Sequence, residues 1–131
     1  MPELPEVEVT RRRVAPLLVG RKIARLRTTQ DSYFFRTKPR SLQARLKGRS
    51  VRELARRGKY LIARLDDDST LILHLGMTGQ LFGEGATSPR LLSATARASL
   101  NPEKQEQFQP DSHTHLQFEF ADGGSRVFFR D

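Results

Sequence analysis

Residues 50–82, SVRELARRGKYLIARLDDDSTLILHLGMTGQLF, contain two strand-like runs that are separated by the polar DDDS sequence at 66–69. This arrangement is typical of β-hairpins. Further along, HLQFEF at 115–120 alternates strictly, with Leu116, Phe118 and Phe120 on one side of the predicted strand. The ADGG sequence that follows indicates a turn that returns the chain through SRVFF. These patterns predict antiparallel pairing.

Two stretches have helical spacing instead. Residues 4–19 place apolar side chains on one helical face, with Pro5 in the first turn and Gly20 as a stop signal. Residues 41–48 predict a short helix that Ser41 caps, with Leu42 and Leu46 as an i,i+4 pair and Gly48 at its end.

The remaining segments complete a picture of one domain over 1–131. Residues 22–29 read weakly as a strand, and the Ser-, Ala-, Thr-, Pro- and Gln-rich stretch 84–112 predicts a mobile loop or insertion. The sequence therefore predicts an α+β fold that is mostly β: an antiparallel β-sandwich flanked by two helices.

Charge is distributed unevenly along the chain, whose net charge is +8. Residues 1–64 hold 18 basic and 5 acidic side chains, whereas residues 65–131 hold 5 basic and 10 acidic ones. Such a basic half favours a polyanionic partner, because neutralised phosphates release counterions. A solvated basic face is the alternative explanation.

Composition excludes several classes of site. There is no cysteine, so disulfides and cysteine-ligated zinc are excluded within this chain, and three scattered histidines do not predict a metal site. No apolar run approaches the ~20 residues that cross a bilayer. No secretory signal is readable at the start, so we expect no membrane partner and a cytoplasmic, nucleoid-associated location.

The opening sequence MPELPEVE could take part in a reaction as well as start a helix. Removal of Met1 would leave Pro2 as the amino terminus, and an α-amine with a pKa of ~8 is partly unprotonated at neutral pH. A proline amine forms a permanently cationic iminium with an aldehyde carbon, which promotes elimination. Glu3 beside it could protonate a leaving group. Prolines and acids also favour helix starts, so spacing alone leaves both interpretations open.

Three motifs in order, MPELPEVE at the start, RRGKYL at 56–61 and HLGMTGQL at 74–81, resemble the N-terminal catalytic domain of the formamidopyrimidine-DNA glycosylase (Fpg/Nei) family. With Leu4 in its first motif, the sequence resembles the branch of the family that acts on oxidised purines more than the endonuclease VIII branch. The resemblance covers the chain apart from 84–112. It implies a bifunctional DNA glycosylase and abasic-site lyase of base excision repair, which acts on 8-oxoguanine and formamidopyrimidines in double-stranded DNA.

The resemblance also implies roles for individual catalytic residues. Pro2 would attack the anomeric carbon of the deoxyribose and form the Schiff base. Glu3 would act as general acid and base, and Glu6 would support that site. Lys59 would contact phosphate and assist elimination; without the motif, it reads as a solvent-facing strand residue.

Other residues would contact DNA if the resemblance holds. Met77 would fill the gap left by an everted nucleotide, although it could be an ordinary turn residue. His74 and His113 would lie near the DNA backbone, with a structural strand histidine as the alternative for His74. Arg56 and Arg57 would add phosphate contacts, or could simply be solvated.

The family also has a helix–two-turn–helix domain and a cysteine zinc finger, which this chain lacks. A structural zinc is therefore expected only in that finger, and no cofactor in this chain. We expect a monomer whose isolated 131 residues have weak or no glycosylase activity. A non-catalytic nucleic-acid-binding domain and a merely structural basic domain remain as rivals.

Overall fold

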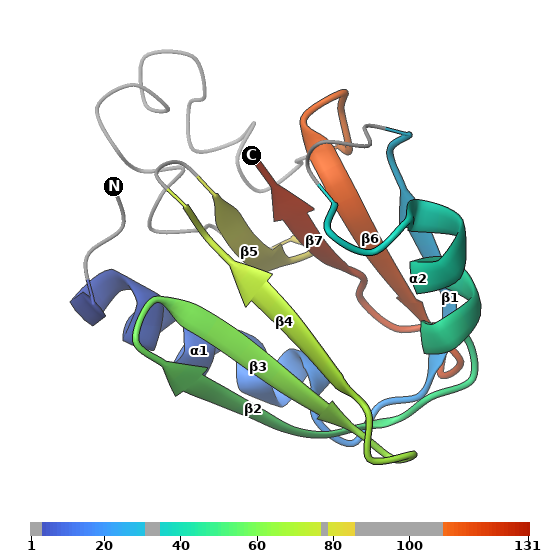
Figure 1. The fold of residues 1–131 in the computed structure, drawn as a ribbon, viewed down its shortest axis with the longest axis horizontal. Coiled ribbons are helices and arrows are strands. Elements are labelled where there is room, and N and C mark those ends of the chain that lie inside the picture. The colour runs from blue at the N-terminus through green and yellow to red at the C-terminus, as the bar shows by residue number, and fades with distance from the viewer. Residues whose placement is uncertain (1–3, 31–34, 77–78, 86–108) are drawn as a thin grey trace.

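Figure 1 shows a computed structural model of the chain, which describes residues 4–30, 35–76, 79–85 and 109–131. Its helices and strands are, in chain order, α1 (Leu4–Leu18), β1 (Ile23–Thr28), α2 (Pro39–Leu46), β2 (Val51–Arg57), β3 (Tyr60–Leu65), β4 (Thr70–His74), β5 (Gln80–Gly83), β6 (Thr114–Phe120) and β7 (Val127–Arg130). Among the described residues, no helix is both long enough and apolar enough to span a membrane.

The strands form two antiparallel sheets, one with the order β1-β6-β7-β5 and the other with the order β2-β3-β4. The predicted hairpins are confirmed: β2, β3 and β4 pair in sequence, and β6 pairs with β7 across the turn that follows Phe120. The predicted mostly-β antiparallel fold with two helices is therefore confirmed.

Helix α1 closes one side of the sandwich. It packs against β2 and β5, which are edge strands of different sheets. Val7, Val14 and Leu18 lie on one helical face, and each is at most 1% exposed. The helix predicted over 4–19 is confirmed to within one residue, and Gly20 follows it with a φ of +82°.

Helix α2 corrects one prediction. It starts at Pro39, two residues before the predicted cap Ser41, and its N-cap residue Lys38 makes no side-chain capping bond. Proline has the backbone angle of a first helical turn already set, so it begins the helix without a cap. Leu46 is buried against the core, as the leucine pair predicted, with Leu42 packed beside it.

The core fills the space between the two sheets and α1. Leu54 and Leu61 come from the three-stranded sheet, and Phe118 and Phe129 come from the four-stranded sheet. Burial of each such side chain stabilises the fold by about 1.5–3 kcal/mol. The packed strands therefore provide a rigid base for the turns at both ends of the sandwich.

One end of the sandwich, here called the far end, contains the end of α1, the β3–β4 turn and the β6–β7 connection. Arg21 organises it: its guanidinium donates to both carboxylate oxygens of Asp122 at 2.8 Å and to the carbonyl oxygens of Leu17 and Ser125 at 2.7 and 2.9 Å. The same group lies 3.8 Å from the centre of the Phe120 ring. The hydrogen bonds from Arg21, with one from a backbone N–H of the turn, lower the pKa of Asp122 to about 2.

Candidate functional site

The other end of the sandwich, here called the rim, gathers segments that are far apart in sequence. It comprises the first two turns of α1, the Gly58–Lys59 turn, the end of β4 with Leu75, Gly76 and Gly79, and the start of β6. Strand pairing brings them together, because Tyr60 at the start of β3 is opposite His74 at the end of β4. Across the other sheet, the start of β5 and the start of β6 both pair with Arg130 at the end of β7 (Figure 1).

The Gly58–Lys59 turn is a tight connection between β2 and β3. Arg57 and Tyr60 pair directly, so only Gly58 and Lys59 lie between the paired strands. Gly58 has a φ of +60°, as the first central residue of a type II′ hairpin turn requires. The turn therefore presents Lys59, half-buried, at the tip of the rim.

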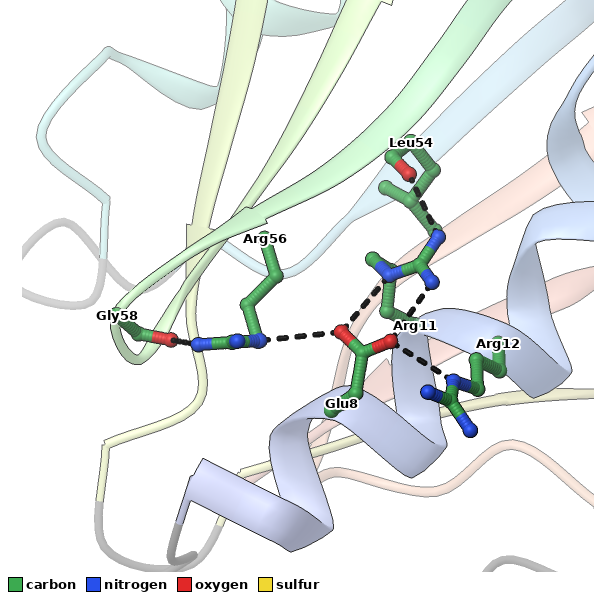
Figure 2. A network of polar contacts seen from close by, with 6 residues as sticks. All are labelled: Glu8, Arg11, Arg12, Leu54, Arg56 and Gly58. Carbon is green, nitrogen blue, oxygen red and sulfur yellow. Dashed lines mark hydrogen bonds and ion pairs between the residues drawn. The ribbon is translucent and has the colours of Figure 1, made fainter.

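A four-residue ionic network fastens this hairpin to α1 (Figure 2). Glu8 accepts hydrogen bonds from Arg11 at 2.9 and 2.7 Å and from Arg12 at 2.9 Å. From β2, Arg56 donates to the same carboxylate at 3.1 Å. These bonds, with that from Arg11 the strongest influence, hold the pKa of Glu8 well below its usual range. The carboxylate is thus ionised wherever the protein is folded at ordinary pH.

The structure separates the two arginines that the sequence presents as a pair. Arg56 is opposite Leu61 and points toward α1, where it meets Glu8, and its Nη1 also donates to the Gly58 carbonyl at 3.1 Å. Arg57 is on the opposite face of β2 and exposed, and no hydrogen bond or ion pair links it to another described residue. Of the two, Arg57 has its charge available to an anion.

His74 is exposed and stacks on Tyr60. Their ring centres are 4.6 Å apart and their planes differ by 33°. The two residues are directly opposite on β3 and β4, one residue away from Lys59. Cross-strand aromatic pairs of this kind stabilise a sheet by about 0.2–1 kcal/mol, and here the imidazole lies against the tyrosine ring.

Two glycines hold the turn that follows β4. The N–H of Gly79 donates to the Leu75 carbonyl at 2.6 Å, and a Cβ at position 79 would lie only 2.2 Å from that oxygen. Gly76 has a φ of +61°. Met77 itself lies outside the described residues.

The remaining predicted residues are placed as follows. Glu6 is exposed in the first turn of α1, where a carboxylate complements the helix dipole. His113 is exposed just before β6, and its backbone N–H donates to the carboxylate of Asp111 at 3.0 Å. Pro2 and Glu3 lie outside the described residues.

The described part of the rim is positively charged. At the start of α1 and the Gly58–Lys59 turn, five cations lie against two described anions: Arg11, Arg12, Arg56, Arg57 and Lys59 against Glu6 and Glu8. At the start of β6, Asp111 and Asp131 lie near Arg130, so the described cations of the rim still outnumber its described anions. Among the residues that the structure describes, no group of three or more histidine, aspartate or glutamate side chains could hold a metal ion. An anion is the ligand that this surface suits.

The whole chain, residues 1–131, matches the family model of the formamidopyrimidine-DNA glycosylase N-terminal domain. A protein of Dinoroseobacter shibae named formamidopyrimidine-DNA glycosylase is 38% identical over 131 residues, which are 100% of this chain and 42% of the relative. A protein of the same name from Methylorubrum populi is 52% identical over 80 residues, 61% of this chain and 27% of the relative. The chain thus spans about two fifths of the length of the curated relatives that it matches from end to end.

Solved structures of similar fold belong to the same family. The complex of Lactococcus lactis formamidopyrimidine-DNA glycosylase with DNA containing an abasic site has a TM-score of 0.73 and 32% identity, over 99% of this chain and 40% of that one. The complex of that enzyme with DNA containing Fapy-dG has a TM-score of 0.72 and 32% identity, over 98% and 40%. Fold and sequence together define the chain as an N-terminal domain of the formamidopyrimidine-DNA glycosylase type. It belongs to the formamidopyrimidine-DNA glycosylase family, which confirms the resemblance of its three motifs.

Two residues of the rim escaped the sequence analysis. Glu8 was considered only for the helix dipole, although its spacing of three and four residues from Arg11 and Arg12 is a readable ion-pair signal. Tyr60 lay inside the RRGKYL motif without a role of its own. The contact between Glu8 and Arg56 spans 48 residues of sequence, and no local signal reveals it.

Proposed function

We propose that this chain is the catalytic N-terminal domain of a bifunctional DNA glycosylase and abasic-site lyase that removes oxidised purines from double-stranded DNA. The observation that carries the proposal is the rim, where Lys59, His74 and the start of α1 meet at one positively charged edge. The names of the relatives and the lesion-containing DNA in the Lactococcus lactis complexes support the same substrate class.

The nucleophile would be the amine of Pro2 after removal of Met1. This proposal is supported by the start of helix α1 at Leu4, two residues after Pro2 in the chain. With a pKa of ~8, a useful fraction is unprotonated at neutral pH.

The reaction would proceed through a covalent intermediate on Pro2. The Pro2 nitrogen attacks the anomeric carbon of the deoxyribose and releases its proton, and the bond from that carbon to the damaged base breaks as the base takes up that proton. Glu3 as a carboxylic acid protonates the ring oxygen, the sugar opens, and a cationic iminium forms. Loss of a proton from the neighbouring carbon then expels the 3′ phosphate, and water hydrolyses the iminium to restore the amine.

The other rim residues would hold the DNA in place. Lys59 and Arg57 would contact phosphates, and His74, whose ring packs on that of Tyr60, would lie against the same backbone. Met77 would fill the space that an everted nucleotide leaves, since a flexible apolar side chain can occupy an unstacked step.

Borohydride trapping on duplex DNA with one abasic site tests this proposal. The chain is produced behind a cleavable tag, so that Pro2 is an amide before cleavage and the free terminus after it. We expect a covalent adduct only after cleavage, and peptide mass mapping should locate it on the N-terminal peptide. Binding that persists without any adduct would instead identify a non-catalytic nucleic-acid-binding domain.

A further inference from the structure

Glu8 is an anion in the middle of a surface that suits anions, and this placement requires an explanation. Removing it would make the rim more positive, which by charge alone would favour DNA. The presence of an anion here is therefore better explained by a contribution through geometry. The relevant geometry is the connection that Glu8 makes between α1 and β2.

We propose that Glu8 is a positioning residue for Lys59: through Arg56 it holds the Gly58–Lys59 turn against the start of α1. This inference rests on the proposed function, in which Lys59 meets a DNA phosphate. A polar connection from α1 to the turn consists of two hydrogen bonds. The first joins Glu8 to Arg56 Nε at 3.1 Å, and the second joins Arg56 Nη1 to the Gly58 carbonyl at 3.1 Å.

The carboxylate is itself held in place before Arg56 reaches it. Arg11 binds both oxygens of Glu8 in a bidentate pair, with Nε to Oε1 and Nη2 to Oε2, and Arg12 adds a third bond at Oε2. A fixed carboxylate presents Oε1 in one direction, toward β2, as Figure 2 shows. Arg11 also reaches the Leu54 carbonyl at 3.4 Å, which gives α1 a second contact with the same strand.

Arg56 suits the bridging role because its guanidinium is a planar fork. One edge of the group binds Glu8 while another nitrogen binds the Gly58 carbonyl. A lysine ammonium at this position would keep the charge but lose this fixed geometry. The carbonyl that Arg56 holds belongs to the residue directly before Lys59, so the bridge acts on the turn that carries Lys59.

The direction in which one substitution changes DNA affinity distinguishes a positioning role from a role through charge. In Glu8→Gln the negative charge disappears, so a role through charge alone predicts equal or tighter DNA binding. If Glu8 positions Lys59, binding weakens although the protein has become more positive. Loss of one phosphate contact reduces the slope of log K against log salt by about 0.9.

The experiment compares Glu8→Gln with Glu53→Gln, a matched control on the same strand. Glu53 forms an exposed ion pair with Arg64 on the outer face of the three-stranded sheet, so its removal has the same charge effect away from the bridge. Binding to a duplex with an abasic-site analogue is measured over a range of salt concentrations, and amide hydrogen exchange is measured at residues 58–60. We expect Glu8→Gln to show the shallower slope and roughly tenfold faster exchange at 58–60, while Glu53→Gln shows neither.

A second pair of variants keeps the charge constant. Arg56→Lys should accelerate exchange at the turn and lower the salt slope, whereas Arg52→Lys, at the far end of the same strand where Arg52 pairs with Asp68, should do neither. The double variant with Glu8→Gln should be no worse than Arg56→Lys alone, because both changes break one bridge.

Two results would overturn the inference: unchanged exchange at 58–60 in Glu8→Gln, or binding as tight as in the wild type with the same slope. Exchange requires no DNA and no trapped adduct. Failure of the wild type to trap abasic DNA therefore counts against the proposed function, and normal exchange in both bridge variants counts against the role of Glu8.

Discussion

The two ends of helix α1 combine carboxylate and guanidinium groups in opposite proportions. At the rim, one carboxylate, Glu8, is surrounded by three guanidinium groups. At the far end, one guanidinium, that of Arg21, is surrounded by one carboxylate, two carbonyl oxygens and an aromatic ring. The far end satisfies its cation within the protein, whereas the rim has more cations than its described anions can pair.

The turns follow the same division. At the far end, Asp66 and Asp68 lie in the β3–β4 turn within reach of Arg49 and Arg52. At the rim, the Gly58–Lys59 turn carries Lys59 beside Arg57. The difference teaches that a turn whose charges are paired with opposite charges serves the fold, whereas a turn that gathers charge of one sign suits an oppositely charged ligand. Each prediction below tests one side of this comparison.

Arg21→Ala should give the largest effect on stability. It removes four hydrogen bonds and the contact with Phe120, and leaves Asp122 without its ion-pair partner, so we expect the free energy of unfolding to fall by about 2–3 kcal/mol. Urea titration followed by circular dichroism measures it. Arg12→Ala at the rim, where the side chain is 72% exposed, should change stability by less than about 0.5 kcal/mol; similar losses in both variants would erase the distinction.

Lys59→Gln should affect DNA rather than stability. Loss of one phosphate contact weakens binding and makes the salt slope shallower, so the fall in affinity between roughly 50 and 200 mM salt should be about threefold to fourfold smaller than in the wild type. Fluorescence anisotropy on a duplex with an abasic-site analogue measures it. Lys22→Gln makes the same change in net charge at the far end, where the side chain is exposed, and should leave the salt slope nearly unchanged.

Asp122→Asn should cause a smaller loss of stability that depends on pH. The pKa of Asp122 in the folded protein is lowered to about 2, below an unfolded value of about 3.9, so ionised Asp122 stabilises the fold above pH ~4. That contribution declines as pH falls and is gone below about pH 2. Unfolding curves of wild type and variant should therefore differ at pH 6 and converge toward pH 2, and a constant difference would contradict the assignment.

Tyr60→Leu should give the smallest effect. The stack on His74 is exposed, and its loss should destabilise the sheet by about 0.5 kcal/mol. Tyr60→Phe keeps the ring and should match the wild type. Nuclear magnetic resonance of the His74 ring would show whether its position changes; identical spectra for Leu and Phe would mean that the stack does not orient the imidazole.

Local sequence patterns predicted most of the fold because its elements depend on local rules. The spacing of Val7, Val14 and Leu18 determines the buried face of α1, and the turn residues at 66–69 separate β3 from β4. The predicted start of α2 was wrong, because Pro39 begins the helix at its first position, before the predicted serine cap.

The site was predictable where it depends on contiguous motifs and not where it depends on packing. RRGKYL and HLGMTGQL place Lys59 and His74 on neighbouring strands, and strand pairing then brings them close. Strand periodicity alone could have separated Arg56 from Arg57, since neighbouring strand residues face opposite ways. That Arg56 meets Glu8 depends on how α1 lies across β2, which only tertiary structure determines.

The close approach of Gly79 to Leu75 has a consequence for protein engineering. With 2.2 Å available for a first side-chain carbon, even alanine at position 79 must displace backbone. Libraries that diversify positions 77 and 78 should therefore keep glycine at position 79. Randomising all three together would fill such a library with variants whose defect is conformational, and selection would then report folding instead of recognition.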